Sequence, residues 1–162
     1  EPGTGLTRIA RTGLTSGEPF RRAPQDSMFC FSLTQPTGYE LGLLSLQHQE
    51  RTGIFGCDEY AVYSNKVIEV APAVITAVVS TDLKCDTGGE FKTALNTDIF
   101  MAVWTKVIQG GRYRYNDWTA KVDPDSVFFP QRLLSVVSVY HADASEPRGV
   151  YLNNCKFGLH GP

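Results

Sequence analysis

The chain has 162 residues, of which 42% are hydrophobic and 20% charged, and its formal net charge is −2. This length and composition predict one folded domain with a hydrophobic core, and they exclude a chain that is disordered throughout. The slightly acidic balance argues against nonspecific nucleic-acid binding, which needs a basic face, and no apolar run reaches the ~20 residues of a membrane-spanning helix.

The first 27 residues are rich in Gly, Thr, Pro and Arg and show no sustained periodicity. We interpret residues 1–27 as an extended arm or linker, which becomes ordered only if it packs on something else. The folded domain is then expected to occupy residues 28–162.

The first half of this domain predicts a strand, a helix and a second strand. Residues 28–33 form a short apolar run that is typical of a buried strand. Thr37 and Glu40 have the spacing of a capping box, so we expect a helix over 37–52. Residues 54–63 predict the second strand. Because strand, helix and strand in this order form a βαβ unit, the two strands should be parallel.

Five further segments are expected along the second half of the chain. They are an extended excursion over 67–79, a helix from Asn96 to Gly110, a strand over 118–122, a helix from Pro130 to Val139 and a last strand over 150–155. Apolar residues at helical spacing indicate the first helix, and proline at the first position indicates the second. The whole pattern predicts an α/β fold of three layers, in which helices flank a mostly parallel sheet.

The motif Asp123-Pro124-Asp125 comes directly after the strand expected over 118–122. Open α/β sheets bind ligands at the carboxyl ends of their strands. Two carboxylates one residue apart offer the oxygen ligands that Mg²⁺ or Mn²⁺ prefers when it bridges a diphosphate. One would ligate the cation, and the other would hold the metal shell or a ribose hydroxyl. Lys121 is assigned to the same nucleotide site. The alternative is a structural turn in which Asp caps the next helix and Pro fixes φ.

Other polar residues are weaker candidates. Asp58 and Glu59 could contact the ribose or base of a nucleotide, although they could also be a solvated acidic pair. His160 could complete a metal shell, whereas His48 is interpreted as a surface or packing side chain. The alternating cations and rings of residues 112–115 favour a solvent-exposed β segment, with nucleic-acid stacking as the alternative.

Four cysteines complete the inventory: Cys30, Cys57, Cys85 and Cys155. Their spacings match no zinc-binding pattern. An even number permits two disulfides in three possible pairings and an oxidising compartment, whereas the alternative is a set of buried reduced thiols. The sequence leaves both possibilities open.

Three segments, residues 57–64, 95–100 and 118–130, resemble a group of dinoflagellate proteins that are in turn similar to the nucleotide-binding half of GT-A glycosyltransferases. The resemblance covers about residues 28–160 and is most specific in the block from Lys121 to Pro130 and in residues 151–155. It implies a nucleotide-sugar donor, Mn²⁺ or Mg²⁺, and a D-x-D motif that maps onto Asp123 and Asp125.

The resemblance has two departures. The middle residue of the motif is Pro124, and the chain stops where the acceptor-binding half of such an enzyme would begin. We therefore expect a glycosyltransferase-like domain without its acceptor half. The alternative is a non-catalytic, peripheral accessory subunit of a large complex, such as a dinoflagellate photosystem–antenna supercomplex, that contacts its neighbours through the 1–27 arm. The expected compartment is the secretory pathway or the thylakoid lumen or periphery, where disulfides are plausible.

Overall fold

The computed structural model describes residues 26–84, 87–88, 93–94, 96–140 and 152. Most of the expected arm, His160 and the last expected strand, apart from Leu152, lie outside the described residues.

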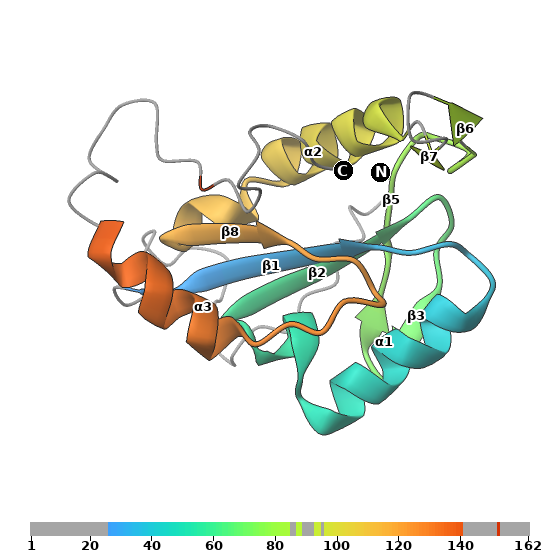
Figure 1. Cartoon of the computed structure of the whole chain (residues 1–162). Helices are drawn as coiled ribbons and strands as arrows, with labels where there is room; N and C mark the ends of the chain where they lie inside the picture. Colours follow the sequence, from blue (N-terminus) through green and yellow to red (C-terminus); the bar gives the residue numbers. More distant parts are fainter. Residues whose placement is uncertain (1–25, 85–86, 89–92, 95, 141–151, 153–162) are drawn as a thin grey trace, which may run out of the picture.

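The main sheet has four parallel strands in the order β5-β2-β1-β8. The strands are β1 (Met28–Leu33), β2 (Glu59–Ser64), β5 (Ala77–Val78) and β8 (Trp118–Lys121). The chain runs outward from β1 to β2 and β5, and then crosses back to place β8 on the other side of β1 (Figure 1). The strand order therefore reverses between β1 and β8.

Helices cover both faces of the sheet. α1 (Tyr39–Glu50) and α3 (Pro130–Val137) lie on one face, and α2 (Thr97–Gly110) lies on the other (Figure 1). This arrangement confirms the three-layer α/β fold expected from the sequence. None of the helices in the described part of the chain is both long and apolar enough to cross a membrane.

Several short elements connect these layers. They are the 3-10 helices η1 (Gly53–Gly56) and η2 (Arg112–Tyr115), and the antiparallel pairs of β3 (Glu69–Ala71) with β4 (Val74–Ile75) and of β6 (Thr87–Gly88) with β7 (Thr93–Ala94). The first hairpin forms most of the extended excursion expected over 67–79, whereas the end of that segment is β5, which joins the main sheet.

β1 supplies side chains to two hydrophobic cores, because successive residues of a strand point to opposite faces. Met28 and Cys30 pack with Leu44 of α1 on one face. Phe29 and Phe31 pack on the other face with residues of α2, including Val103. A strand buried on both faces needs a continuous apolar run, which explains the composition of β1.

Two predicted strands differ from the structure. The strand expected over 54–63 begins only at Glu59, because Ile54 and Phe55 are buried in the helical turn η1. Gly53, with φ +58°, supplies the left-handed conformation that starts this turn. Residues 112–115 form η2 and not a β segment, because Gly111 ends α2 in the left-handed region and accepts a hydrogen bond from the backbone N–H of Arg114.

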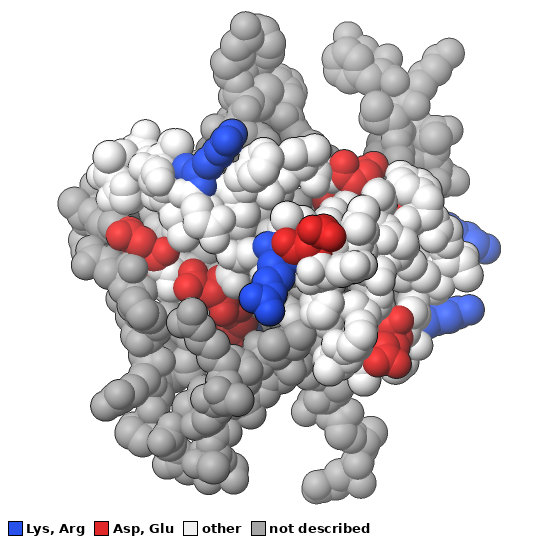
Figure 2. Space-filling model, turned by 90° about the horizontal axis from the view of Figure 1, so that it is seen from below, with Lys and Arg blue, Asp and Glu red and all other residues white. Residues whose placement is uncertain are grey.

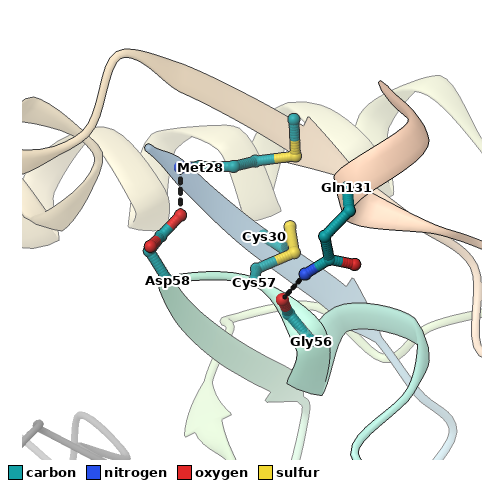
Figure 3. The surroundings of a disulfide bond; sticks show 6 residues. All are labelled: Met28, Cys30, Gly56, Cys57, Asp58 and Gln131. Carbon is teal, nitrogen blue, oxygen red and sulfur yellow. Dashed lines mark hydrogen bonds between the residues drawn. A yellow bond between two sulfur atoms is a disulfide. The ribbon is translucent and has the colours of Figure 1, made fainter. Parts of the chain in front are cut away.

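A disulfide joins Cys30, in the middle of β1, to Cys57, just before β2 (Figure 3). Cys85 and Cys155 lie outside the described residues. Beside the bond, Asp58 accepts a hydrogen bond from the Met28 backbone N–H at 3.0 Å, and Gln131 of α3 donates to the Gly56 carbonyl at 2.9 Å. The disulfide closes the β1-α1-β2 unit covalently, and such bonds form and persist in oxidising compartments.

Candidate functional site

The Asp123-Pro124-Asp125 turn lies at the carboxyl edge of the sheet, directly after β8. The segment from Thr34 to Gly38, between β1 and α1, leaves the same edge, because β1 and β8 are parallel neighbours (Figure 1). The strand order reverses at this point, and both segments then pass to the face of the sheet that carries α1 and α3. Open α/β sheets bind ligands in the crevice formed at such a reversal.

A side chain of α1 supports the backbone of the Asp-Pro-Asp turn. The side-chain amide of Gln47 donates a hydrogen bond to the Pro124 carbonyl at 2.7 Å, and the Ser126 backbone N–H donates to the Asp123 carbonyl at 3.0 Å. Gly53 leaves room for Gln47, since a Cβ at Gly53 would lie 2.4 Å from Gln47 Oε1. The backbone of the turn is therefore fixed on α1, while Asp125 remains exposed.

Asp123 is engaged by a cation of its own strand. Lys121 Nζ lies 2.6 Å from Asp123 Oδ1 and 4.0 Å from the centre of the Phe100 ring on α2. The Lys121 side chain is 18% exposed and that of Asp123 is 43% exposed. The Asp123 carboxylate is therefore accessible from solvent, but one of its oxygens already has a positively charged partner.

Asp125 has a neutral partner from the opposite face of the sheet. The Tyr39 hydroxyl, in the first turn of α1, donates a hydrogen bond to Asp125 Oδ2 at 3.2 Å. This hydrogen bond, together with the negative charge of Asp125, raises the pKa of Tyr39. Asp123 therefore contacts Lys121 on the α2 face of the sheet, whereas Asp125 contacts Tyr39 of α1 on the other face.

The start of α1 differs from the predicted capping box. The N-cap is Gly38, with φ +116°, and no side chain caps the first turn. Glu40 instead turns back and accepts hydrogen bonds from the Gln35 backbone N–H at 2.8 Å and from the Thr34 hydroxyl at 3.1 Å. These bonds shape the segment between β1 and α1. The positive end of the α1 dipole then faces the same edge as the Asp-Pro-Asp turn.

Two polar residues that the sequence analysis did not select lie at the carboxyl end of β2. Ser64 Oγ and Asn65 Oδ1 are buried and have no hydrogen-bond partner among the residues that the structure describes. Buried polar atoms are nearly always paired in proteins, so these two atoms are available to a polar group at this edge. The sequence carries a signal for these two residues, because they are polar residues at the end of a buried strand.

Asp58 and Glu59 lie at the opposite edge of the sheet, because β2 begins at Glu59. Asp58 accepts the Met28 hydrogen bond, and Glu59 forms an ion pair with Arg112 and accepts a hydrogen bond from the Asn116 side chain at 3.2 Å. The structure therefore does not bring this acidic pair together with Asp123 and Asp125. Their polar atoms join β1, β2 and η2 at the amino edge.

Of the two histidines that the sequence analysis assigned, the structure describes only His48. The His48 ring on α1 packs edge-on against Phe55, with 5.1 Å between ring centres, which agrees with a packing side chain. His160 lies outside the described residues.

Among the described residues, the candidate metal ligands at this edge are the two carboxylates of Asp123 and Asp125. Within the described ranges, no group of three or more His, Cys, Asp or Glu side chains could hold a metal ion. Mg²⁺ is usually bound by one or two carboxylates together with substrate phosphates and waters. Within the described residues, Asp123 and Asp125 would therefore need a diphosphate and waters to complete the shell of such an ion.

The face that carries α1 and α3 shows acidic and basic side chains interspersed among uncharged ones (Figure 2). Among the described residues, this face has no concentration of positive charge of the kind that a nucleic-acid backbone would require.

A scan against protein-family models, a search of curated proteins and a search of solved structures each found no match for this chain. The function must therefore be inferred from the site itself, since a fold class does not determine an activity.

Proposed function

We propose that the carboxyl edge between β1 and β8 binds a nucleotide sugar through its diphosphate and a Mn²⁺ or Mg²⁺ ion, as the donor site of a glycosyltransferase-like domain. The observation that carries this proposal is the position of Asp123 and Asp125 at the strand-order reversal, opposite the uncapped start of α1. The two unpaired polar atoms at the end of β2 add support, because they give a polar ligand further groups to contact on the same edge.

Each residue has a defined task in this proposal. Asp123 and Asp125 would hold the cation, and the first-turn amides of α1 would face the phosphates. Asn65 would accept a hydrogen bond from a ligand hydroxyl. When bound, the cation would neutralise the diphosphate and make it a better leaving group. The acceptor side of a glycosyl transfer would have to come from residues other than these.

Calorimetry on the full chain tests donor binding with a panel of nucleotide sugars and nucleoside diphosphates, with and without Mn²⁺. We expect metal-dependent binding of at least one ligand. Asp123→Asn or Asp125→Asn should weaken it on the order of tenfold or more, which corresponds to the loss of a charged contact.

Asp58→Asn is the matched control, because it removes the same charge at the amino edge while keeping an acceptor for the Met28 N–H. It should leave binding unchanged. The proposal fails if no ligand binds in the presence of metal, or if Asp58→Asn weakens binding as much as the two variants at the carboxyl edge.

A second candidate function is a peripheral accessory subunit of a large complex, such as a photosystem–antenna supercomplex in the thylakoid lumen. One observation favours contact with another protein. Met101 and Ile108 on α2 are 62% and 54% exposed, and exposed Trp104 lies between them at helical spacing. Contiguous exposed apolar side chains often mark protein–protein contacts.

Co-purification with an isolated supercomplex tests this second function. The wild-type chain should co-purify, and Ile108→Lys should not, because a lysine cannot be buried unpaired in an apolar contact. Gln109→Lys is the control, since it adds the same charge at the neighbouring exposed position. Equal retention of both variants, or no retention of the wild type, would rule this function out.

A further inference from the structure

The ammonium group of Lys121 occupies a small cation site that is built from the chain itself. It lies 2.6 Å from Asp123 Oδ1 and 4.0 Å from the centre of the Phe100 ring. A carboxylate and the negative face of an aromatic ring both attract a positive charge. Because the side chain is only 18% exposed, it is largely shielded from solvent and its ammonium is held against these two groups.

The register of β8 explains why this lysine reaches Asp123. Lys121 pairs with Phe31 of β1, whose side chain lies in the core beneath α2, and neighbouring Ala120 packs in the core on the opposite face. Lys121 must therefore point to the α2 face, where its aliphatic stem passes Phe100. The last residue of the strand then presents its charge to the first residue of the turn.

We infer that the Lys121 ammonium occupies the position of the divalent cation on Asp123 in the ligand-free protein. When cation and diphosphate bind together, the Lys121 side chain moves and its ammonium contacts the phosphate oxygens of the ligand. This inference rests on the proposed function. A free divalent cation at Asp123 would meet the positive charge of Lys121 at close range, and like charges at that distance repel. The diphosphate removes the conflict, because it offers anionic oxygens to the ammonium.

Asp125 shows why the effect belongs to Lys121. Its partner is the neutral Tyr39 hydroxyl, which does not compete with a cation by charge. The exchange at Asp123 therefore makes the two ligands cooperative: each should bind more tightly when the other is present. Such coupling is reciprocal by thermodynamic necessity.

Lys121→Met tests the exchange, because methionine keeps an unbranched apolar stem near Phe100 and removes the charge. The full-length wild type and the variant are titrated by calorimetry with Mn²⁺ alone, with inorganic diphosphate alone and with their equimolar complex. We expect the wild type to bind the complex at least about fivefold more tightly than either component, which is the lower range of typical site-to-site coupling.

The variant should show opposite changes for the two ligands. Its affinity for Mn²⁺ alone should rise about fivefold, because the competing charge is gone, and its affinity for the complex should fall by about the same factor. Lys121→Arg should retain the wild-type coupling. Lys106→Met, which removes a lysine from α2, is the control and should change neither affinity.

Each outcome decides between the inference and the proposed function. If the wild type binds the complex but Lys121→Met leaves the Mn²⁺ affinity unchanged or lowers it, the exchange is wrong and the proposed function stands. If the wild type binds neither Mn²⁺ nor the complex, both are overturned. Circular dichroism verifies that Lys121→Met is folded, and Lys121→Gln replaces it in the same titrations if it is not.

Discussion

Gly53 shows how one residue can position the Asp-Pro-Asp turn from a distance. Its φ of +58° is in the region that favours glycine, and its missing side chain leaves space for Gln47, which donates the hydrogen bond to Pro124. A side chain at Gly53 would therefore strain the backbone and displace the residue that supports the turn.

Gly53→Ala is expected to lower the free energy of unfolding by about 1–3 kcal/mol, because the alanine is forced into a left-handed conformation and its Cβ would meet Gln47 Oε1 at 2.4 Å. Urea unfolding measures the change. Gly42→Ala is the control: the space around a Cβ there is open within α1, so this variant should gain about 0.5–1 kcal/mol. Equal stability of Gly53→Ala and wild type would refute the structural role of Gly53.

Two tyrosines of β2 should make the protein sensitive to alkali. Burial raises the pKa of Tyr60 to about 12 from the ordinary 10.0. Burial, with a further contribution from the negative charge of Glu59, raises the pKa of Tyr63 to about 12. Between these pH values, the unfolded chain has lost phenolic protons that the folded chain still holds.

The free energy of unfolding should therefore be fully retained below about pH 10 and should fall as the pH rises towards about 12. Urea unfolding at several pH values, followed together with tyrosinate absorbance, measures this dependence. Tyr60→Phe should reduce the slope of the decline. A free energy of unfolding that stays constant through this pH range would contradict the burial of the two hydroxyls.

The β1-α1-β2 unit is the element that supports both edges of the sheet. Its helix holds Pro124 and Asp125 at the carboxyl edge, and its disulfide closes the unit near the amino edge. A loop closed by two cysteines 27 residues apart loses conformational freedom mainly in the unfolded chain.

Reducing the Cys30–Cys57 disulfide is expected to lower the free energy of unfolding by about 3.5 kcal/mol, from the entropy of closing a loop of this length. Urea unfolding of the oxidised and reduced protein gives the difference, and thiol titration confirms the state of the bond. A reduced protein as stable as the oxidised one would show that the disulfide does not constrain the unfolded chain.

The elements with local signals were predicted well. α3 begins at Pro130, and α2 ends at Gly110 with Gly111 in the left-handed region, as their proline and glycine signals indicated. The start of β2 was misplaced, because the apolar pair Ile54 and Phe55 resembles strand sequence but is buried in a 3-10 turn. Apolar character alone does not distinguish these two ways of reaching the core.

The arrangement of the whole molecule could be predicted only in outline. A three-layer α/β fold follows from the order of the segments, but the pairing of β8 with β1 depends on contacts between residues about 90 positions apart. The partners of the turn are equally distant, since Tyr39 meets Asp125 across 86 positions and Gln47 meets Pro124 across 77. The motif was therefore visible in the sequence, whereas the groups that hold it were not.

The two acidic pairs lie at opposite edges of the sheet. Asp123 and Asp125 lie at the carboxyl edge, and Asp58 and Glu59 lie at the amino edge. A ligand that selects the first pair must leave the second undisturbed.

Paramagnetic broadening of backbone amide signals by substoichiometric Mn²⁺ with inorganic diphosphate is the most direct measurement of this claim. We expect Gly38, Asp123 and Asp125 to broaden first, Asp58 and Glu59 to keep their intensity, and the double variant Asp123→Asn with Asp125→Asn to abolish the effect. Broadening centred on Asp58 and Glu59, or no selective broadening at all, would contradict a cation–diphosphate site at the carboxyl edge.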